Sequence, residues 1–219
     1  MSTIPDNICV SVAEKTFDEI SAALKTVTFA EIRLDACEIT ENEIRRLFST
    51  SDKILTATCR EGRYDNRERT RRLLAAVEAG ATYVDVEAEA DNDLRKTIAE
   101  SAKRKGCKLI ISHHDFEKTP EYEELRSIVD TCRTLGADIV KLVTTACSYA
   151  DNARLMALYA DCRDLLAFAM GETGKITRIA CLYAGAPFTY AALSDNKPVA
   201  CGQLSAERMM KIIGLLEPI

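Results

Sequence analysis

The chain has 219 residues, of which 47% are hydrophobic and 29% charged, a composition typical of a globular protein and not of a collagenous or low-complexity one. The net charge of −5 gives no overall positive field for nucleic acid or an anionic membrane, and no apolar run approaches the length of a membrane span. Nine cysteines without Cys-x-x-Cys spacing, and a start without a signal-peptide pattern, predict reduced thiols packed as small hydrophobic side chains in a cytoplasmic protein.

Eight short runs rich in β-branched residues alternate with amphipathic helical segments, at intervals that fit one strand plus one crossover helix. The predicted strands lie at 7–12, 30–34, 53–58, 83–87, 108–112, 138–143, 165–170 and 188–193. Thr40 and Glu43 form a capping-box pattern before the second helix, and Thr119 with Pro120 predicts the start of the fifth. Glycines that tolerate the left-handed conformation are expected to end three helices, at Gly80, Gly106 and Gly136.

This alternation requires a parallel sheet with helices on its faces, either an open doubly wound sheet or a closed barrel. The strands of an open sheet would be apolar on both faces, but several strands here carry charge at alternate positions. These alternating residues are Glu31, Arg33 and Asp35 on one strand and Asp85, Glu87 and Glu89 on another. A barrel with its active site at the C-terminal mouth accounts for them. We therefore predict an α/β fold, a compact (β/α)8 TIM barrel forming a single catalytic domain over residues 1–219.

Lys141 is the strongest single indication of chemistry, because it lies in an otherwise apolar run, Ile-Val-Lys-Leu-Val at 139–143. Burial disfavours an ammonium group and gives a nucleophilic amine, which suits Schiff-base catalysis. The alternative is a lysine that extends to solvent or pairs with a carboxylate. From this position alone both interpretations stay open.

Two further motifs follow later strands. His113 and His114 end a strand on opposite faces, so at most one points into the mouth, where it could transfer protons. Adjacent histidines cannot both chelate one ion, so we expect no metal site. The segment Gly-Glu-Thr-Gly-Lys at 171–175 lacks the first glycine and the final hydroxyl residue of a phosphate-binding loop, which indicates a tight turn. Arg178 beyond it suits bidentate binding of a carboxylate.

A locally basic run follows the third strand, at Arg60, Arg63, Arg67, Arg69, Arg71 and Arg72. Asp65–Arg69 and Glu68–Arg72 have i,i+4 spacing, which predicts that most of the run is a solvated, salt-bridged helix face and not a nucleic-acid site. Arg60 differs, because it directly follows the strand where a barrel loop begins.

Six segments together resemble type I 3-dehydroquinate dehydratases of the shikimate pathway. They are Glu-Ile-Arg-Leu-Asp at 31–35, Thr-Cys-Arg-Glu-Gly at 58–62, Ser-His-His-Asp-Phe-Glu-Lys-Thr-Pro at 112–120, Asp-Ile-Val-Lys-Leu at 138–142, Met-Gly-Glu-Thr-Gly-Lys-Ile-Thr-Arg at 170–178 and Gly-Gln-Leu-Ser at 202–205. The matches run nearly from end to end, and those around His114, Lys141 and Arg178 are specific in combination and order.

The resemblance implies a mechanism. Lys141 condenses with the ketone of 3-dehydroquinate, and the resulting iminium acidifies the adjacent carbon. His114 removes that proton and protonates the departing hydroxyl, so that water leaves by syn elimination and imine hydrolysis releases 3-dehydroshikimate. No cofactor or metal is needed, since the lysine supplies the electrophile. The resemblance also implies a homodimer with a small-molecule substrate and no nucleic-acid or membrane partner.

The resemblance assigns further roles residue by residue. Arg178 would bind the substrate carboxylate, and Glu61 matches the family glutamate that orients the histidine. Four more residues match positions that contact the substrate or hold the site together: Glu31, Arg33, Arg60 and Gln203. Residues 194–203 would form a lid over the mouth.

This chain departs from the family pattern in the lid, where Val199 replaces a common serine and Cys201 a common proline. We expect weaker lid contact with substrate and a less rigid lid. His113, in place of a commoner asparagine, is expected to face outward.

Two alternatives compete with this interpretation. Another class I Schiff-base barrel, such as an aldolase for a phosphorylated sugar, should carry a phosphate-binding turn late in the chain, which 171–174 only half fits. A catalytically idle barrel used for binding has only the basic run near Arg67 in its favour, and it would have no physical reason to keep a buried lysine.

Overall fold

The computed structural model describes residues 6–216 and confirms the eight predicted strands, with small shifts at their ends. The strands are β1 (Ile8–Val12), β2 (Phe29–Arg33), β3 (Ile54–Thr58), β4 (Tyr83–Glu87), β5 (Lys108–His114), β6 (Ile139–Thr145), β7 (Leu165–Met170) and β8 (Thr189–Ala192). The helices are α1 (Phe17–Leu24), α2 (Glu41–Thr50), α3 (Asn66–Glu78), α4 (Asn92–Lys105), α5 (Tyr122–Thr134), α6 (Tyr149–Ala157), α7 (Gly171–Gly174), α8 (Thr177–Ala184) and α9 (Ala206–Leu216), with a short 3-10 helix at Leu158–Ala160.

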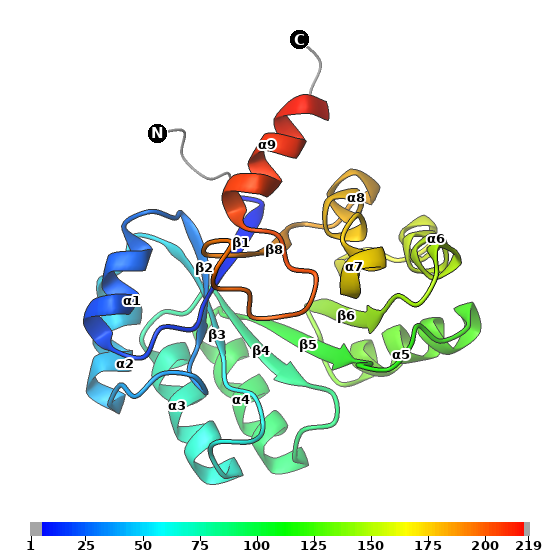
Figure 1. The fold of residues 1–219 in the computed structure, drawn as a ribbon. Helices are drawn as coiled ribbons and strands as arrows, with labels where there is room; N and C mark the ends of the chain where they lie inside the picture. The colour runs from blue at the N-terminus through cyan, green and yellow to red at the C-terminus, as the bar shows by residue number, and fades with distance from the viewer. Residues whose placement is uncertain (1–5, 217–219) are drawn as a thin grey trace.

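The strands form one parallel sheet in the order β7-β6-β5-β4-β3-β2-β1-β8. The sheet curls so that β7 and β8 lie at the two ends of this order, and the helices surround it (Figure 1). The predicted (β/α)8 barrel is therefore confirmed, in a nearly closed form. Its strands run in the same direction, so their carboxyl ends meet at one mouth.

Three aromatic rings fill the opposite end of the barrel. Phe29 and Tyr83 begin β2 and β4, and Phe188 immediately precedes β8. The Phe29 ring lies 4.8 Å from Phe188 and 5.6 Å from Tyr83, centroid to centroid. Because this end is apolar and packed, the polar strand residues can gather only at the mouth.

Local capping explains several helix boundaries and corrects one prediction. Thr40 and Glu43 form the expected capping box of α2, and Gly106 ends α4 with φ of 71°. The predicted start of the fifth helix at Thr119 and Pro120 is wrong, because α5 begins at Tyr122. The Thr119 hydroxyl is instead used in tertiary contacts, 2.7 Å from Thr144 Oγ1 and 2.9 Å from the carbonyl of Thr145.

The basic run on α3 is as predicted only in part: Arg67 and Arg71 are exposed, but the other two arginines of the helix are not. Arg69 and Arg72 are only 1% and 5% exposed, so this face of α3 packs against the barrel and is not solvated. Arg69 does not pair with Asp65, which caps α3; its guanidinium binds Glu87 at 2.8 Å. Arg72 keeps the expected pair with Glu68, at 3.6 Å, but also donates to backbone carbonyls of the β2–α2 loop.

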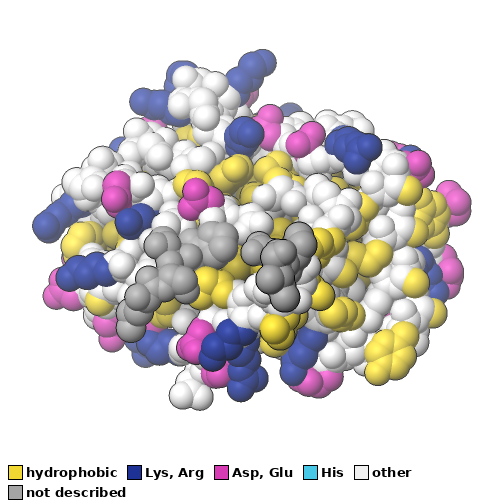
Figure 2. Space-filling view, turned by 90° about the horizontal axis from the view of Figure 1, so that it is seen from above, with side chains coloured by type: hydrophobic (Ala, Val, Ile, Leu, Met, Phe, Trp, Pro, Cys, Tyr) yellow, Lys and Arg dark blue, Asp and Glu magenta, His cyan; other side chains and the backbone are white. Residues whose placement is uncertain are grey.

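The cysteines follow the expected pattern of packing. All nine are free thiols, and seven are buried, while Cys147 and Cys201 are exposed. Seen from the side of α9, the surface mixes acidic and basic side chains, with hydrophobic side chains gathered between them (Figure 2). This face shows no large patch of one charge.

Candidate active site

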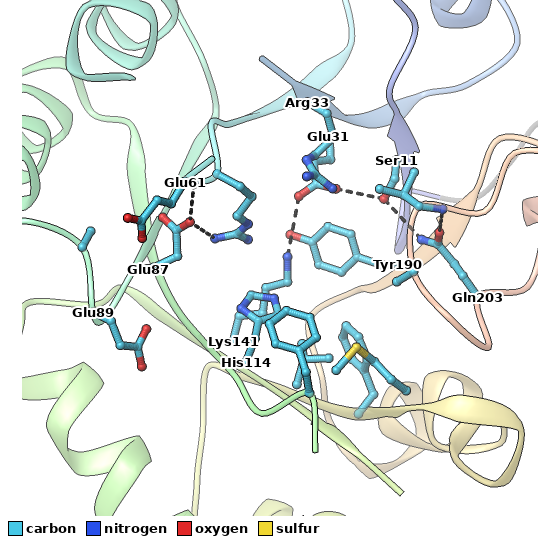
Figure 3. Close-up of a pocket in the computed structure, with 18 of the residues that line it drawn as sticks. Ser11, Glu31, Arg33, Glu61, Glu87, Glu89, His114, Lys141, Tyr190 and Gln203 are labelled. Carbon is cyan, nitrogen blue, oxygen red and sulfur yellow. Dashed lines mark hydrogen bonds and ion pairs between the residues drawn. The ribbon is translucent and has the colours of Figure 1, made fainter. Parts of the chain in front are cut away.

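A pocket of about 500 Å³ opens at the carboxyl ends of the strands, and it is lined by all eight site residues predicted from the sequence. Figure 3 shows the pocket, with Lys141, His114 and Gln203 among the labelled residues. They are Glu31, Arg33, Arg60, Glu61, His114, Lys141, Arg178 and Gln203. These residues come from four strands or their ends, from α8 and from the loop before α9. Parallel strands thus bring together side chains that are far apart in the sequence.

Lys141 lies on β6 at the bottom of the pocket and is only 5% exposed. Its Nζ is 2.9 Å from Asp85 Oδ2 and 3.6 Å from Glu31 Oε1, and it lies 3.9 Å from the centroid of the Tyr190 ring. The lysine is thus both buried, as the Schiff-base interpretation expects, and paired with carboxylates, as the alternative expects. The carboxylates of Asp85 and Glu31 compensate the positive charge of its ammonium form, and Lys141 still lines the pocket.

Asp85 on β4 joins Lys141 to Arg60. Arg60 Nη2 lies 2.7 Å from Asp85 Oδ2, and Ser112 on β5 donates to Asp85 Oδ1 at 2.6 Å. Burial alone would raise the pKa of Asp85, but the neighbouring Arg60 and Lys141 cations hold it well below its usual value. The network continues outward, because Arg60 also lies 3.7 Å from Glu87, which in turn binds Arg69.

Glu31 on β2 is held by hydroxyl groups and is linked to the lid. Thr58 donates to its Oε1 and Ser11 to its Oε2, both at 2.9 Å. Gln203 donates to the Ser11 hydroxyl at 3.3 Å and accepts from the backbone N–H of Val199 at 2.9 Å. A continuous chain of hydrogen bonds therefore runs from the lid to the carboxylate beside Lys141.

The two histidines face opposite sides, as predicted. His114 lines the pocket and stacks on Phe116, with ring centroids 5.9 Å apart. Burial, and then the Arg60 and Lys141 cations, lower the pKa of His114 well below its usual value, so the ring is a neutral base at neutral pH. His113 lies outside the pocket lining and pairs with Glu89, which raises the pKa of His113.

Glu61 occupies the rim of the pocket and is exposed. Its backbone N–H donates to Glu87 at 3.4 Å, but within residues 6–216 its carboxylate makes no hydrogen bond to His114. Figure 3 shows it beside Glu87, directed away from the histidine. Its role in orienting His114 stays a prediction.

Arg178 lies in the first turn of α8, which follows the short helix α7. It is 1% exposed, and its guanidinium lies 4.8 Å from the centroid of the Phe168 ring. Its Nε and Nη2 are buried without a hydrogen-bond partner, and burial lowers the pKa of Arg178 to about 10. A planar donor with unused hydrogens in a buried wall is suited to a carboxylate ligand. Arg33 differs, because it is already paired with Asp35 at 2.7 Å.

The predicted lid, residues 194–203, contributes Val199, Ala200 and Gln203 to the pocket lining and is anchored at both ends. It leaves β8 and returns through a bridge between Ala192 and Ser205. Gly171 donates its backbone N–H to the carbonyl of Cys201 at 3.3 Å. Gly202 has a φ of 73°, and a Cβ there would lie 2.4 Å from the carbonyl oxygen of Gly171. The seated lid thus depends on glycine at 202.

Sequence reasoning missed several residues that complete the site: Ser11, Asp85, Ser112, Phe168 and Tyr190. Asp85 was placed at the mouth by its alternation with Glu87, but its pairing with Lys141 was not predicted. Tyr190 and Phe168 follow the inward alternation of β8 and β7, yet aromatic residues in a strand are the ordinary content of a barrel core. Their position at the mouth carries no sequence signal.

Comparisons with known proteins agree with this geometry. The model of the type I 3-dehydroquinase family matches residues 8–218. The 3-dehydroquinate dehydratase of Dehalococcoides mccartyi strain BAV1 is 36% identical over 213 residues, which cover 94% of this chain and 93% of the relative. The enzyme of the same name from Thermococcus gammatolerans is 36% identical over 190 residues, covering 85% of this chain and 87% of the relative.

Solved structures of the same class superpose closely. The 3-dehydroquinate dehydratase of Aquifex aeolicus has a TM-score of 0.81 at 26% identity, covering 97% of this chain and 99% of that one. The type I enzyme of Clostridium difficile, solved with covalently modified comenic acid, has a TM-score of 0.84 at 24% identity, with 98% and 93% covered, and this likeness shows the shared fold. The chain therefore belongs to the type I 3-dehydroquinase family of hydro-lyases, the 3-dehydroquinate dehydratases.

Proposed function

We propose that this pocket converts 3-dehydroquinate to 3-dehydroshikimate and water through an imine on Lys141. One observation carries the proposal. A buried primary amine, a histidine held neutral and a guanidinium with unused donors line the same pocket, at Lys141, His114 and Arg178. These are the nucleophile, the base and the carboxylate-binding group that such a dehydration requires.

Lys141 attacks the ketone carbon of the substrate, and the carbonyl oxygen leaves as water when the iminium forms. The iminium draws electrons from the adjacent C–H bond, and neutral His114 takes that proton. The protonated histidine then returns the proton to the β-hydroxyl on the same face, which leaves as water. Hydrolysis of the conjugated imine releases the product and restores the amine.

The remaining residues bind and orient the substrate. Arg178 binds the carboxylate, which replaces the missing partners of its Nε and Nη2. Residues that line the pocket beside Lys141 contact the hydroxyl groups or hold the walls, at Glu31, Arg33, Arg60 and Gln203. Glu61 at the rim orients His114 once the lid and substrate are in place.

A borohydride trapping experiment tests the proposal. The protein is incubated with 3-dehydroquinate, reduced with borohydride and digested, and the mass of each peptide is measured. An adduct on the peptide that contains Lys141, together with a rise in enone absorbance before reduction, supports the proposal. Lys141→Met should lose both signals. Absence of an adduct and of enone formation in the unaltered protein would sink the proposal.

The cellular setting is part of the same proposal. We infer that the whole chain works as one catalytic domain, in the cytoplasm, as a homodimer, and without a nucleic-acid or membrane partner. In residues 6–216 no helix has the length and hydropathy needed to cross a bilayer. Exposed apolar side chains on α8 and α9, among them Tyr183, Leu215 and Leu216, offer a surface for a second copy. Sedimentation equilibrium measures the oligomeric state, and a monomer at micromolar concentration would contradict the dimer.

A further inference from the structure

Asp85 is a buried carboxylate with cations on one oxygen and a hydroxyl on the other. Its side chain is inaccessible to solvent. Oδ2 lies 2.9 Å from Lys141 Nζ and 2.7 Å from Arg60 Nη2, while Ser112 donates to Oδ1 at 2.6 Å. Three donors from three other strands or their ends therefore fix the plane of this carboxylate. Because the side chain is inaccessible to solvent and is not part of the pocket lining, a substrate hydroxyl does not compete for these oxygens.

The atom that Asp85 contacts is the one that becomes the imine nitrogen. When an ammonium and a ketone condense, two of the three ammonium hydrogens leave with the carbonyl oxygen as water, and the iminium keeps one hydrogen and the positive charge. Mass and charge balance without a further reagent. The remaining N–H is a single donor in a buried site, and it needs an acceptor.

Asp85 is the acceptor best placed to serve it. Glu31 Oε1 lies farther from Nζ, at 3.6 Å, and both of its oxygens already accept hydrogen bonds from Thr58 and Ser11. Tyr190 has its ring centroid 3.9 Å from Nζ, and its hydroxyl makes no hydrogen bond within residues 6–216. His114, a further titratable neighbour, is held neutral and acts as the base.

A counter-ion at this place has a chemical consequence. An imine nitrogen is a weaker base than an amine, so a buried imine without a nearby anion would lose its proton and cease to withdraw electrons. A fixed carboxylate favours the protonated form. A preorganised charge of this kind does so without any reorganisation during the reaction.

We propose that Asp85 is a further catalytic residue: its carboxylate is the counter-ion that keeps the Lys141 imine protonated, and Ser112 is a positioning residue that fixes it. The inference rests on the proposed function. Asp85 stays ionised throughout, and no bond to it forms or breaks. Arg60 shares the same oxygen and prevents Asp85 from turning away when the ammonium becomes an iminium.

The first test is Asp85→Asn, which keeps the shape and removes the charge. Turnover should fall on the order of 100-fold or more, the effect of removing one preorganised charge-stabilising group. Borohydride reduces iminium faster than neutral imine, so the rate of trapping with substrate should fall as well. Asp151→Asn is the matched control, since Asp151 is a buried carboxylate of α6 that pairs with Arg154 and is not part of the pocket lining. It should keep the trapping rate of the unaltered protein.

The second test separates the charge from packing. Asp85→Ala leaves a space between two cations, and added formate should restore part of the turnover, whereas neutral formamide of the same size should not. If Asp85→Ala does not fold, Asp85→Asn alone decides. Trapping and turnover of Asp85→Asn equal to those of the unaltered protein, or equal rescue by formate and formamide, would overturn the inference while leaving the proposed function intact. An unaltered protein without any adduct overturns the proposed function first.

Discussion

Replacing Arg178 should make the substrate-free protein more stable, because the fold buries this charge without an anionic partner. Burial lowers the pKa of Arg178 from 12.5 to about 10. By this difference the buried charge lowers the free energy of unfolding by about 3 kcal/mol. The loss applies at every pH below the folded-state pKa, and stability is recovered only as the pH rises from about 10 toward 12.5. The contact with the Phe168 ring returns about 1–2 kcal/mol. Arg178→Met should therefore raise the free energy of unfolding by about 1–2 kcal/mol at pH 7.

The assay is urea unfolding at pH 7, with Arg69→Met as a matched control. Arg69 is equally buried, at 1% exposure, but it is fully used: Nη2 binds Glu87 at 2.8 Å and Nε donates to the carbonyl of Cys59 at 3.0 Å. Its removal takes from Glu87 its nearest cation and leaves the Cys59 carbonyl without the Arg69 donor, which should cost about 3 kcal/mol. Two substitutions of the same chemistry and burial should thus shift stability in opposite directions.

The same substitution should weaken binding. A hydrogen-bonded charge is worth about 1.5–3 kcal/mol, so Arg178→Met should raise the KM for a carboxylate substrate by roughly 10–100-fold. A variant that is more stable but binds substrate more weakly is expected when the replaced charge serves ligand binding and not folding. If Arg178→Met lost as much stability as Arg69→Met, the idea that Arg178 is uncompensated would be refuted.

Three other predictions concern the base and the lid. His114→Ala should lower turnover by about 10²–10⁴-fold while the borohydride adduct still forms, and His113→Ala should leave turnover nearly unchanged; exchanged results would show that the facing assignment is wrong. The folded-state pKa of His114 lies well below 6.5, so turnover should persist as the pH falls through 6.5. Below that pH the unfolded chain binds a proton at His114 that the folded chain does not, so the unaltered protein should lose stability relative to His114→Asn. A pH–rate profile with its acid limb at or above 6.5, or parallel urea midpoints for the two proteins, contradicts this. Gly202→Ala should raise KM by displacing the lid, while Gly214→Ala, with open space around it in α9, should not; equal KM values would argue against the tight contact at Gly171.

The barrel could be predicted because each strand carries its own pattern. Charged residues at alternate strand positions, such as Glu31 and Asp85, indicated a barrel with an active site at its mouth. The failures were at helix surfaces and boundaries. The i,i+4 pattern of α3 predicted solvated arginines, but packing of α3 against the barrel buries Arg69 and Arg72. Which face of a helix is buried depends on tertiary packing, and charge spacing within the helix does not predict it.

The site was predicted as a set of residues and not as a set of contacts. Motifs name Lys141 and His114, because each lies in a local segment with its own chemistry. Pairings cross strands: Lys141 and Asp85 are 56 positions apart in the chain, and Arg60 and Ser112 are 52 apart. Which carboxylate meets which cation depends on strand register and side-chain reach. The sequence contains no direct signal for either, so Asp85 could be placed at the mouth but not beside the amine.

The pairing of charges in the pocket also indicates how many negative charges a substrate can carry. Within residues 6–216, Arg33, Arg60, Arg69 and Lys141 each lie against a carboxylate, whereas Arg178 does not. One uncompensated cation suits one negative charge. A sugar phosphate would bring a second negative charge among the carboxylates of the wall, where repulsion opposes it. Small monocarboxylates should therefore compete with substrate through Arg178, whereas sugar phosphates of similar size should not; equal competition by both in steady-state inhibition assays would favour the aldolase alternative.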